Sequence, residues 1–178
     1  FQPAAETVRS GGTLRTYRLA VSATGEYTQF HGGTAAAGLA AIVTAINRVD
    51  GIYETELAIR LVLVANNNLL IFTNPSTDPF SNTMPNSLLT QSQSTIDSII
   101  GNANYDVGHI FSTGGGGLSQ VGAVCIGTFK AQSETGLPSP TGDPFYIDFV
   151  AHEIGHEFGA NHTFNGLGGS CNGQFNVS

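Results

Sequence analysis

The stretch that decides the fold is DPFYIDFVAHEIGHEFGANH, residues 143–162. Asp143 followed by Pro144 is typical of a helix start, because an aspartate caps free backbone amides and a proline suits the first helical position. The apolar residues that follow recur at helical spacing and can form one buried face. We therefore expect a helix over residues 144–158, which Gly159 ends.

Three histidines of this stretch have the spacing of a metal site. His152 and His156 lie four residues apart, so a helix projects both imidazoles from one face, about 6 Å apart. A turn at Gly159 lets the chain bend back with His162, which a continuous helix would carry about 15 Å further along its axis. Three protein ligands with an open fourth position are typical of catalytic zinc. We therefore expect Zn²⁺ on His152, His156 and His162.

Glu153 follows the first histidine and is not needed as a ligand. It is placed to accept a proton from a zinc-activated water and to pass it to the leaving amine, as a general base and then acid. A helix with surface histidines would explain neither Gly155 inside the helix nor the two carboxylates beside the histidines. For the second carboxylate, Glu157, we expect a solvated position. A zinc hydrolase acting on a non-peptide amide or ester stays open at this point.

Residues 152–162 match the extended motif HExxHxxGxxH in full, and the sequence there resembles the metzincin clan of zinc endopeptidases. More narrowly it is similar to bacterial reprolysin (adamalysin-like, M12B-type) catalytic domains, since GAVC at residues 122–125 is similar to the stretch before a family cysteine. The resemblance implies a peptide or protein substrate. It also implies an α/β fold: a twisted, mostly parallel sheet with an antiparallel edge strand, two packing helices and a zinc-site helix.

The resemblance places the antiparallel edge strand within residues 118–124. Peptide substrates of the clan lie along this strand by β-augmentation. The residues implied in substrate binding are Leu118, Ser119, Gln120, Val121 and Gly122.

Two features depart from the family pattern. Metzincins carry a methionine turn after the third histidine, whereas the only methionine here is Met84, and reprolysins usually have aspartate where this chain has Thr163. We therefore expect residues 1–178 to be a single catalytic domain cut short, holding the N-terminal subdomain and the start of the C-terminal one. The alternative is a zinc-containing binding or adhesion module, or an inactive half of a peptidase, although the intact Glu153 favours catalysis.

The rest of the chain predicts alternating strands and helices, which is typical of a parallel sheet covered by helices. A strand with one solvated face is expected at 14–23, and a central strand buried on both faces at 57–64. His109 is expected to be buried in a third strand at 105–112, and the glycine run 114–117 to be a mobile surface loop. The expected helices span residues 34–53, capped by Thr34, and 87–100.

Composition excludes several classes of partner. Only 11% of the residues are charged, six are Lys or Arg, and the net charge is −7, so we expect neither nucleic-acid binding nor docking on anionic membranes. The apolar run at 57–65 is too short to span a bilayer. Residues 74–82 are rich in oxygen ligands but lack an ordered Ca²⁺ pattern. The oligomeric state stays open.

Low charge with many Asn, Thr and Gly residues is typical of exported proteins, and the start at Phe1 suits a chain whose leader has been removed. We therefore expect a secreted protein. Cys125 and Cys171 then favour disulfide chemistry with open connectivity, and a reduced buried pair is the alternative.

Overall fold

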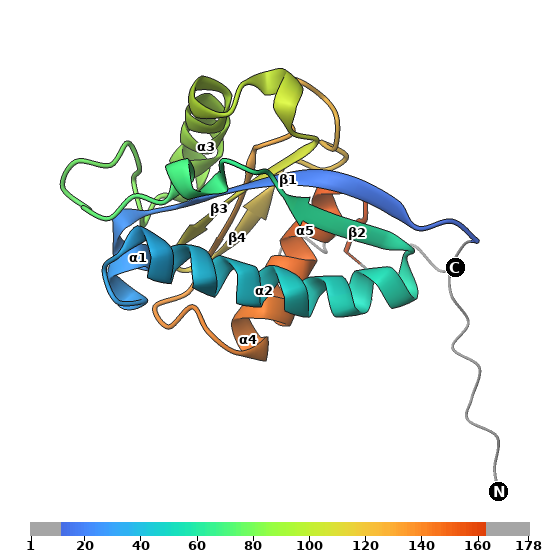
Figure 1. Cartoon of the computed structure of the whole chain (residues 1–178), viewed down its shortest axis with the longest axis horizontal. Coiled ribbons are helices and arrows are strands. Elements are labelled where there is room, and N and C mark those ends of the chain that lie inside the picture. The colour runs from blue at the N-terminus through green and yellow to red at the C-terminus, as the bar shows by residue number, and fades with distance from the viewer. Residues whose placement is uncertain (1–11, 163–178) are drawn as a thin grey trace, which may run out of the picture.

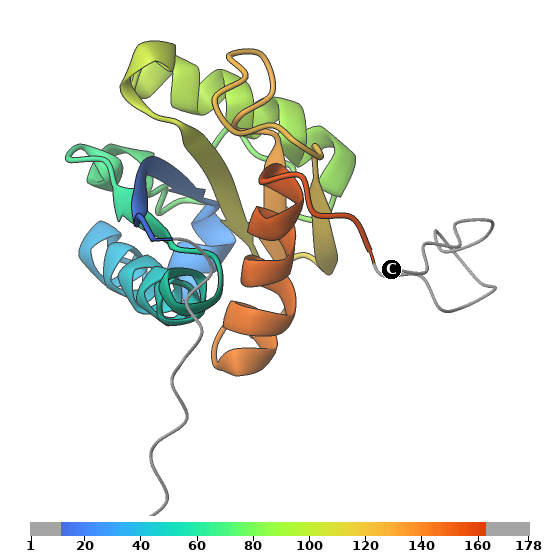
Figure 2. The ribbon, with the colours of Figure 1, turned by 90° about the vertical axis from the view of Figure 1, so that its right-hand side faces the viewer.

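The computed structural model describes residues 12–162 and shows one five-stranded sheet with helices on both faces (Figures 1 and 2). Cys171 and Thr163 lie outside these residues. In chain order the elements are β1 (Arg15–Ala23), α1 (Gly25–Phe30), α2 (Ala35–Glu56), β2 (Ile59–Leu63), η1 (Asn67–Leu70), α3 (Pro85–Ile99), η2 (Asn102–Asn104), β3 (Val107–Ser112), β4 (Gly116–Ser119), β5 (Ser133–Gly136), α4 (Asp143–Phe145), η3 (Tyr146–Ala151) and α5 (His152–Glu157).

The strands lie in the order β2-β1-β3-β5-β4. All neighbours run parallel except β4, which pairs antiparallel with β5 from Gly116 opposite Gly136 to Ser119 opposite Ser133. The expected α/β fold, with a mostly parallel sheet and an antiparallel edge strand, is confirmed.

The prediction of one solvated face for residues 14–23 was wrong for the second half of β1, which lies between β2 and β3 and is buried on both faces from Leu19 to Ala23. Leu19, Val21 and Ala23 point into the larger core, which is covered by α2 and by the helix that runs from α4 to α5 and carries the predicted zinc site. Ala20 points the other way, into a smaller core under α3 with Ile96. Figure 2 shows α3 alone on its face and the other long helices together on the opposite face.

Helix α2 forms as expected. The hydroxyl oxygen of Thr34 accepts a hydrogen bond from the Ala37 amide at 3.2 Å, which confirms the predicted N-cap. By length and composition α2 is also apolar enough to cross a membrane, a property that residues 57–65 lack. In this fold one of its faces, including Ile42 and Val49, is packed in the larger core.

The prediction that residues 57–64 form a central strand was wrong. Strand β2 pairs with β1 alone and lies at the edge of the sheet, with Val62 46% exposed. The carboxylate of Asp50 accepts a hydrogen bond from the Leu61 amide at 2.8 Å. The Asp50 side chain of α2 thus accepts the hydrogen bond of a backbone amide at the open edge of β2. This amide is no longer free to pair with a strand of another chain.

The prediction of a surface loop at 114–117 was also wrong in part, because Gly116 and Gly117 belong to β4. The edge strand expected within residues 118–124 therefore begins two residues earlier. It ends at Ser119, and residues 121 and 122 form a turn.

The zinc-site helix is continuous through α4, η3 and α5, although its first cap differs from the prediction. Gly142 occupies the N-cap position and the Asp143 side chain caps no amide. Asp143 instead accepts two hydrogen bonds of 3.0 Å from Arg48 of α2. The segment Tyr146–Ala151 is a π-helix, a form that often occurs at functional sites.

Candidate metal centre and active site

The zinc-site helix is fixed from below by α2. The Tyr53 hydroxyl donates a 2.6 Å hydrogen bond to the carbonyl of Ala151, the residue before His152. Gly155 faces the same tyrosine, and a Cβ at this position would lie 3.4 Å from the Tyr53 hydroxyl oxygen. A small residue at position 155 therefore lets the helix approach α2 closely.

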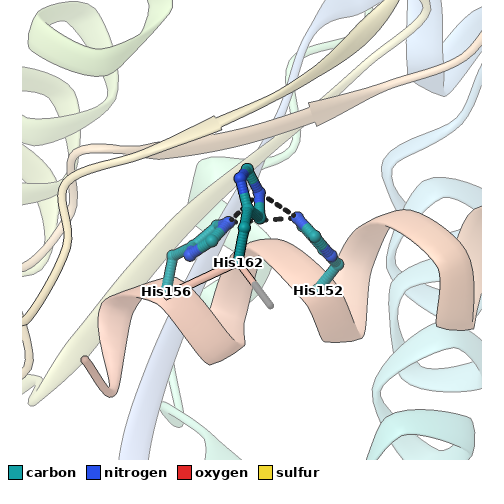
Figure 3. Close-up of side chains that lie close together, drawn as sticks. All are labelled: His152, His156 and His162. Atoms are coloured by element: carbon teal, nitrogen blue, oxygen red, sulfur yellow. Dashed lines mark hydrogen bonds between the residues drawn. The ribbon is translucent and has the colours of Figure 1, made fainter. Parts of the chain in front are cut away.

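Three imidazoles converge above this helix (Figure 3). The Nε2 atoms of His152 and His156 lie 3.0 Å apart, and that of His162 lies 3.0 Å from the first and 2.9 Å from the second. The turn that returns His162 to the helix passes through Gly159, whose φ of +95° suits glycine. The structure thus brings together the three residues predicted from spacing.

Each imidazole needs a defined tautomer to bind a metal, and His156 has the contact that sets it. Its Nδ1 lies 2.7 Å from the Ala160 carbonyl, so Nδ1 carries the proton and Nε2 keeps its lone pair. Burial and the neighbouring His156 lower the pKa of His152, and the same two causes lower the pKa of His162. Lower pKa values favour the neutral imidazoles that bind metals.

The donor set fits zinc. Three neutral imidazoles cannot all hydrogen bond to one another through Nε2, so these close contacts have no explanation within the protein. With sides of 2.9–3.0 Å, the centre of the nitrogen triangle lies closer to each atom than the ordinary Zn–N distance of about 2.0–2.1 Å, so one ion just off this centre can reach all three atoms. His152, His156 and His162 are the residues that would hold it.

Glu153 lies next to this cluster and points at the sheet. Its side chain is only 6% exposed, and Oε2 accepts a hydrogen bond of 2.8 Å from the Ser119 hydroxyl of β4. Burial raises the pKa of this carboxyl group, and the bond from Ser119 partly opposes the rise. A buried carboxyl beside a metal site is a candidate for acid–base chemistry.

The model of the family described as metallo-peptidase family M12B, reprolysin-like, matches residues 13–178. The chain belongs to this family. Membership supports zinc metallopeptidase chemistry in general, and the three-histidine cluster fits the zinc that the family implies. No curated protein matches the sequence.

Solved structures confirm the fold of this reprolysin-like chain. One match belongs to a structure described as a chaperone–substrate complex, with 14% identity and a TM-score of 0.58. The similarity covers 94% of this chain and 29% of the other. At this identity the likeness concerns the fold alone, and this chain spans less than a third of that protein.

The second carboxylate of the motif is not solvated, contrary to the prediction. Glu157 is fully buried, and its Oε2 lies 3.3 Å from Nδ1 of His109, whose Nε2 lies 2.9 Å from the Thr135 hydroxyl. Burial raises the pKa of Glu157 and lowers that of His109 to about 3. The contact between Glu157 and His109 ties the reprolysin-like motif helix to the sheet. The expected burial of His109 is confirmed.

The five residues implied in substrate binding divide between strand and turn. Leu118 and Ser119 lie in β4, and the Gln120 amide extends the pairing with a 2.8 Å bond to the Gln132 carbonyl. Val121 is exposed, and the Gly122 amide donates a 2.9 Å bond to the His156 carbonyl. Their contact with a substrate stays a prediction.

Cys125 follows the turn beside the motif helix. It is exposed and has a positive φ of 64°. The second cysteine, Cys171, lies outside the described residues, so the disulfide stays a prediction.

The burial of Glu134 of β5 was not predicted from the sequence. This residue is 1% exposed, and its Oε1 has no hydrogen-bond partner within residues 12–162. A single glutamate in a short polar strand offers no signal of this burial.

Proposed function

We propose that this chain is the catalytic part of a secreted zinc-dependent endopeptidase in which Glu153 is the general base. The observation that supports the proposal is the convergence of three Nε2 atoms within 3.0 Å of one another, beside a buried carboxyl on the same helix. Histidine ligands with an adjacent glutamate are the donor set of metal-assisted amide hydrolysis.

In the proposed reaction Glu153 accepts a proton from the attacking water and later donates it to the leaving amine. When bound, zinc supplies Lewis acidity that makes water a better nucleophile and polarises the scissile carbonyl. The hydrogen bond from Ser119 occupies one acceptor position of the Glu153 carboxylate, and a carboxylate has further positions that can take a proton from water. Glu153 then donates this proton to the amine of the departing peptide.

The peptide substrate is proposed to lie along β4. This strand is the last of the sheet within residues 12–162, so its outer edge is available to an extended chain. Leu118 and Ser119 would contribute backbone groups from the strand, and residues 120–122 would continue the binding edge toward the zinc-site helix. The proposed substrate class, a peptide or protein, follows from the family.

Export is proposed from composition. Only 11% of the residues are charged, and polarity depends on Asn, Ser, Thr and Gly, which is more typical of exported than of cytosolic proteins. Fractionation of the producing cells tests this, since an intracellular pool of the mature protein with none outside would contradict it.

The Glu153→Gln variant tests the catalytic role. We expect zinc to stay bound at the wild-type stoichiometry, because glutamine leaves the three histidines intact, while turnover of a peptide library falls at least a hundredfold. The matched control is Asp148→Asn, which removes an exposed carboxylate one helical turn before His152.

Product analysis by mass spectrometry distinguishes peptide hydrolysis from cleavage of other amides or esters. Wild-type turnover in Glu153→Gln would contradict the role of Glu153. Bound zinc without any cleavage by the wild-type chain would instead favour the binding module.

A further inference from the structure

We propose that strand β4 positions the general base, with the Ser119 hydroxyl holding the Glu153 carboxylate and Gly117 providing the space that it occupies. The inference rests on the function proposed for Glu153. It gives β4 a second task besides offering its outer edge to a peptide, and it makes Ser119 a positioning residue rather than a substrate contact through its side chain.

The first observation is the pair of contacts that the Ser119 hydroxyl makes. Ser119 donates to Glu153 at 2.8 Å, and its Oγ also lies 2.5 Å from Oγ of Ser133 in the neighbouring strand β5. Ser133 also forms a hydrogen bond to the Glu157 carboxyl group that lowers the pKa of Glu157 against the larger effect of burial, so it lies between Ser119 and the second carboxyl of the helix. Ser133 is fully buried. The Ser119 hydroxyl therefore contacts both Glu153 and a buried neighbour, which limits the rotation of the Ser119 side chain.

The second observation concerns Gly117, two residues before Ser119 and on the same face of β4. A Cβ built there would lie 2.6 Å from Cγ and 2.7 Å from Cδ of Glu153, and closer still to its Oε1. Carbon atoms do not approach this closely without displacement. Gly117 has an ordinary φ, unlike Gly116 at +103°, so its backbone does not require glycine. The absence of a side chain at position 117 therefore serves the Glu153 carboxylate.

The two contacts act on the same group from independent directions. Glu153 has three rotatable side-chain bonds, and a loosely held base would spend much of its time away from the proton it must accept. Ser119 fixes one carboxylate oxygen, and the backbone of Gly117 packs against the stem. Misplacing a catalytic group by about 1 Å can lower a rate by about a hundredfold, so this arrangement is expected to act on kcat.

Four variants of the full protein test the proposal. In Ser119→Ala we expect kcat to fall about tenfold or more with KM within about twofold of wild type and one zinc per chain, and Ser119→Thr to recover most of the loss. In Gly117→Ala we expect a fall of about a hundredfold. The matched control is Gly115→Ala, since a Cβ at Gly115 meets no atom within 4 Å, and its kcat is expected to match wild type.

Crystal structures of Ser119→Ala and Gly117→Ala give a readout that does not depend on activity. We expect the Glu153 carboxylate to leave its wild-type position in both, while the three histidines stay in place. If Gly117→Ala fails to fold, Ser119→Ala decides alone.

An unchanged kcat with a raised KM in Ser119→Ala would make Ser119 a substrate contact and overturn the proposal. A threonine variant no faster than the alanine variant, or an unmoved Glu153, would overturn it as well. These results differ from failure of the proposed function, which wild-type turnover in Glu153→Gln would reveal.

Discussion

Replacement of Glu134 by glutamine is expected to remove a pH-dependent loss of stability. Glu134 lies in β5 on the face of the sheet that α3 covers, and its side chain is 1% exposed. Burial, and then the charge of Glu153, raise the pKa of this carboxyl from 4.5 to about 8, against a smaller opposing effect of a hydrogen bond from Ser112. The folded protein therefore keeps the Glu134 proton at neutral pH.

The magnitude follows from the two pKa values. Below about pH 4.5 the carboxyl is protonated in both the folded and the unfolded chain, so its contribution to stability is complete. As the pH rises toward 8 the unfolded chain releases the proton first, and the free energy of unfolding falls by about 1.4 kcal/mol per pH unit. Between pH 5 and 7.5 this amounts to about 3 kcal/mol. Glutamine has nearly the same shape and does not titrate.

The assay is chemical denaturation of the wild type and of Glu134→Gln at pH 5, 6 and 7.5, at one zinc concentration. Because both chains share the zinc site, the difference between them isolates Glu134. We expect the glutamine variant to gain about 3 kcal/mol relative to wild type from pH 5 to 7.5. A constant difference between wild type and Glu134→Gln would refute the reasoning.

Two further variants test the supports of the metal centre. Gly159→Ala forces a side chain into a φ of +95°, so we expect a loss of about 1 kcal/mol or more and weaker zinc binding in a competition titration. The control is Gly51→Ala on the exposed face of α2, where an added Cβ would meet no atom within 4 Å. This control is expected to stabilise the protein slightly. Equal zinc affinity in the two variants would contradict the role of Gly159. Tyr53→Phe removes the 2.6 Å bond to the Ala151 carbonyl, and denaturation is expected to show a loss of about 1 kcal/mol. Unchanged stability would mean that this bond does not fix the helix.

Local patterns predicted the elements whose environment is simple. The apolar spacing of α2 and its cap at Thr34 and the turn at Gly159 are all set by residues close together in the chain. The convergence of His152, His156 and His162 belongs to the same group, because a helix and one glycine turn suffice to bring these residues together.

Features that depend on distant partners were not predictable in this way. A short apolar run such as β2 has the same pattern in the centre and at the edge of a sheet, and only the pairing partners distinguish the two positions. Glu157 is buried against the sheet, where it contacts His109 of β3, a residue 48 positions away in the chain. Gly117 was predicted to lie in a loop, because a glycine run is typical of loops. The residue that a side chain at position 117 would meet is Glu153, which belongs to a different element.

The central claim is that His152, His156 and His162 hold zinc in a working peptidase, and metal analysis of the purified protein coupled to casein hydrolysis tests it most directly. The account predicts one zinc per chain and cleavage that a chelator abolishes and added zinc restores. A chain that binds no zinc, or whose cleavage survives complete removal of the metal, would contradict it.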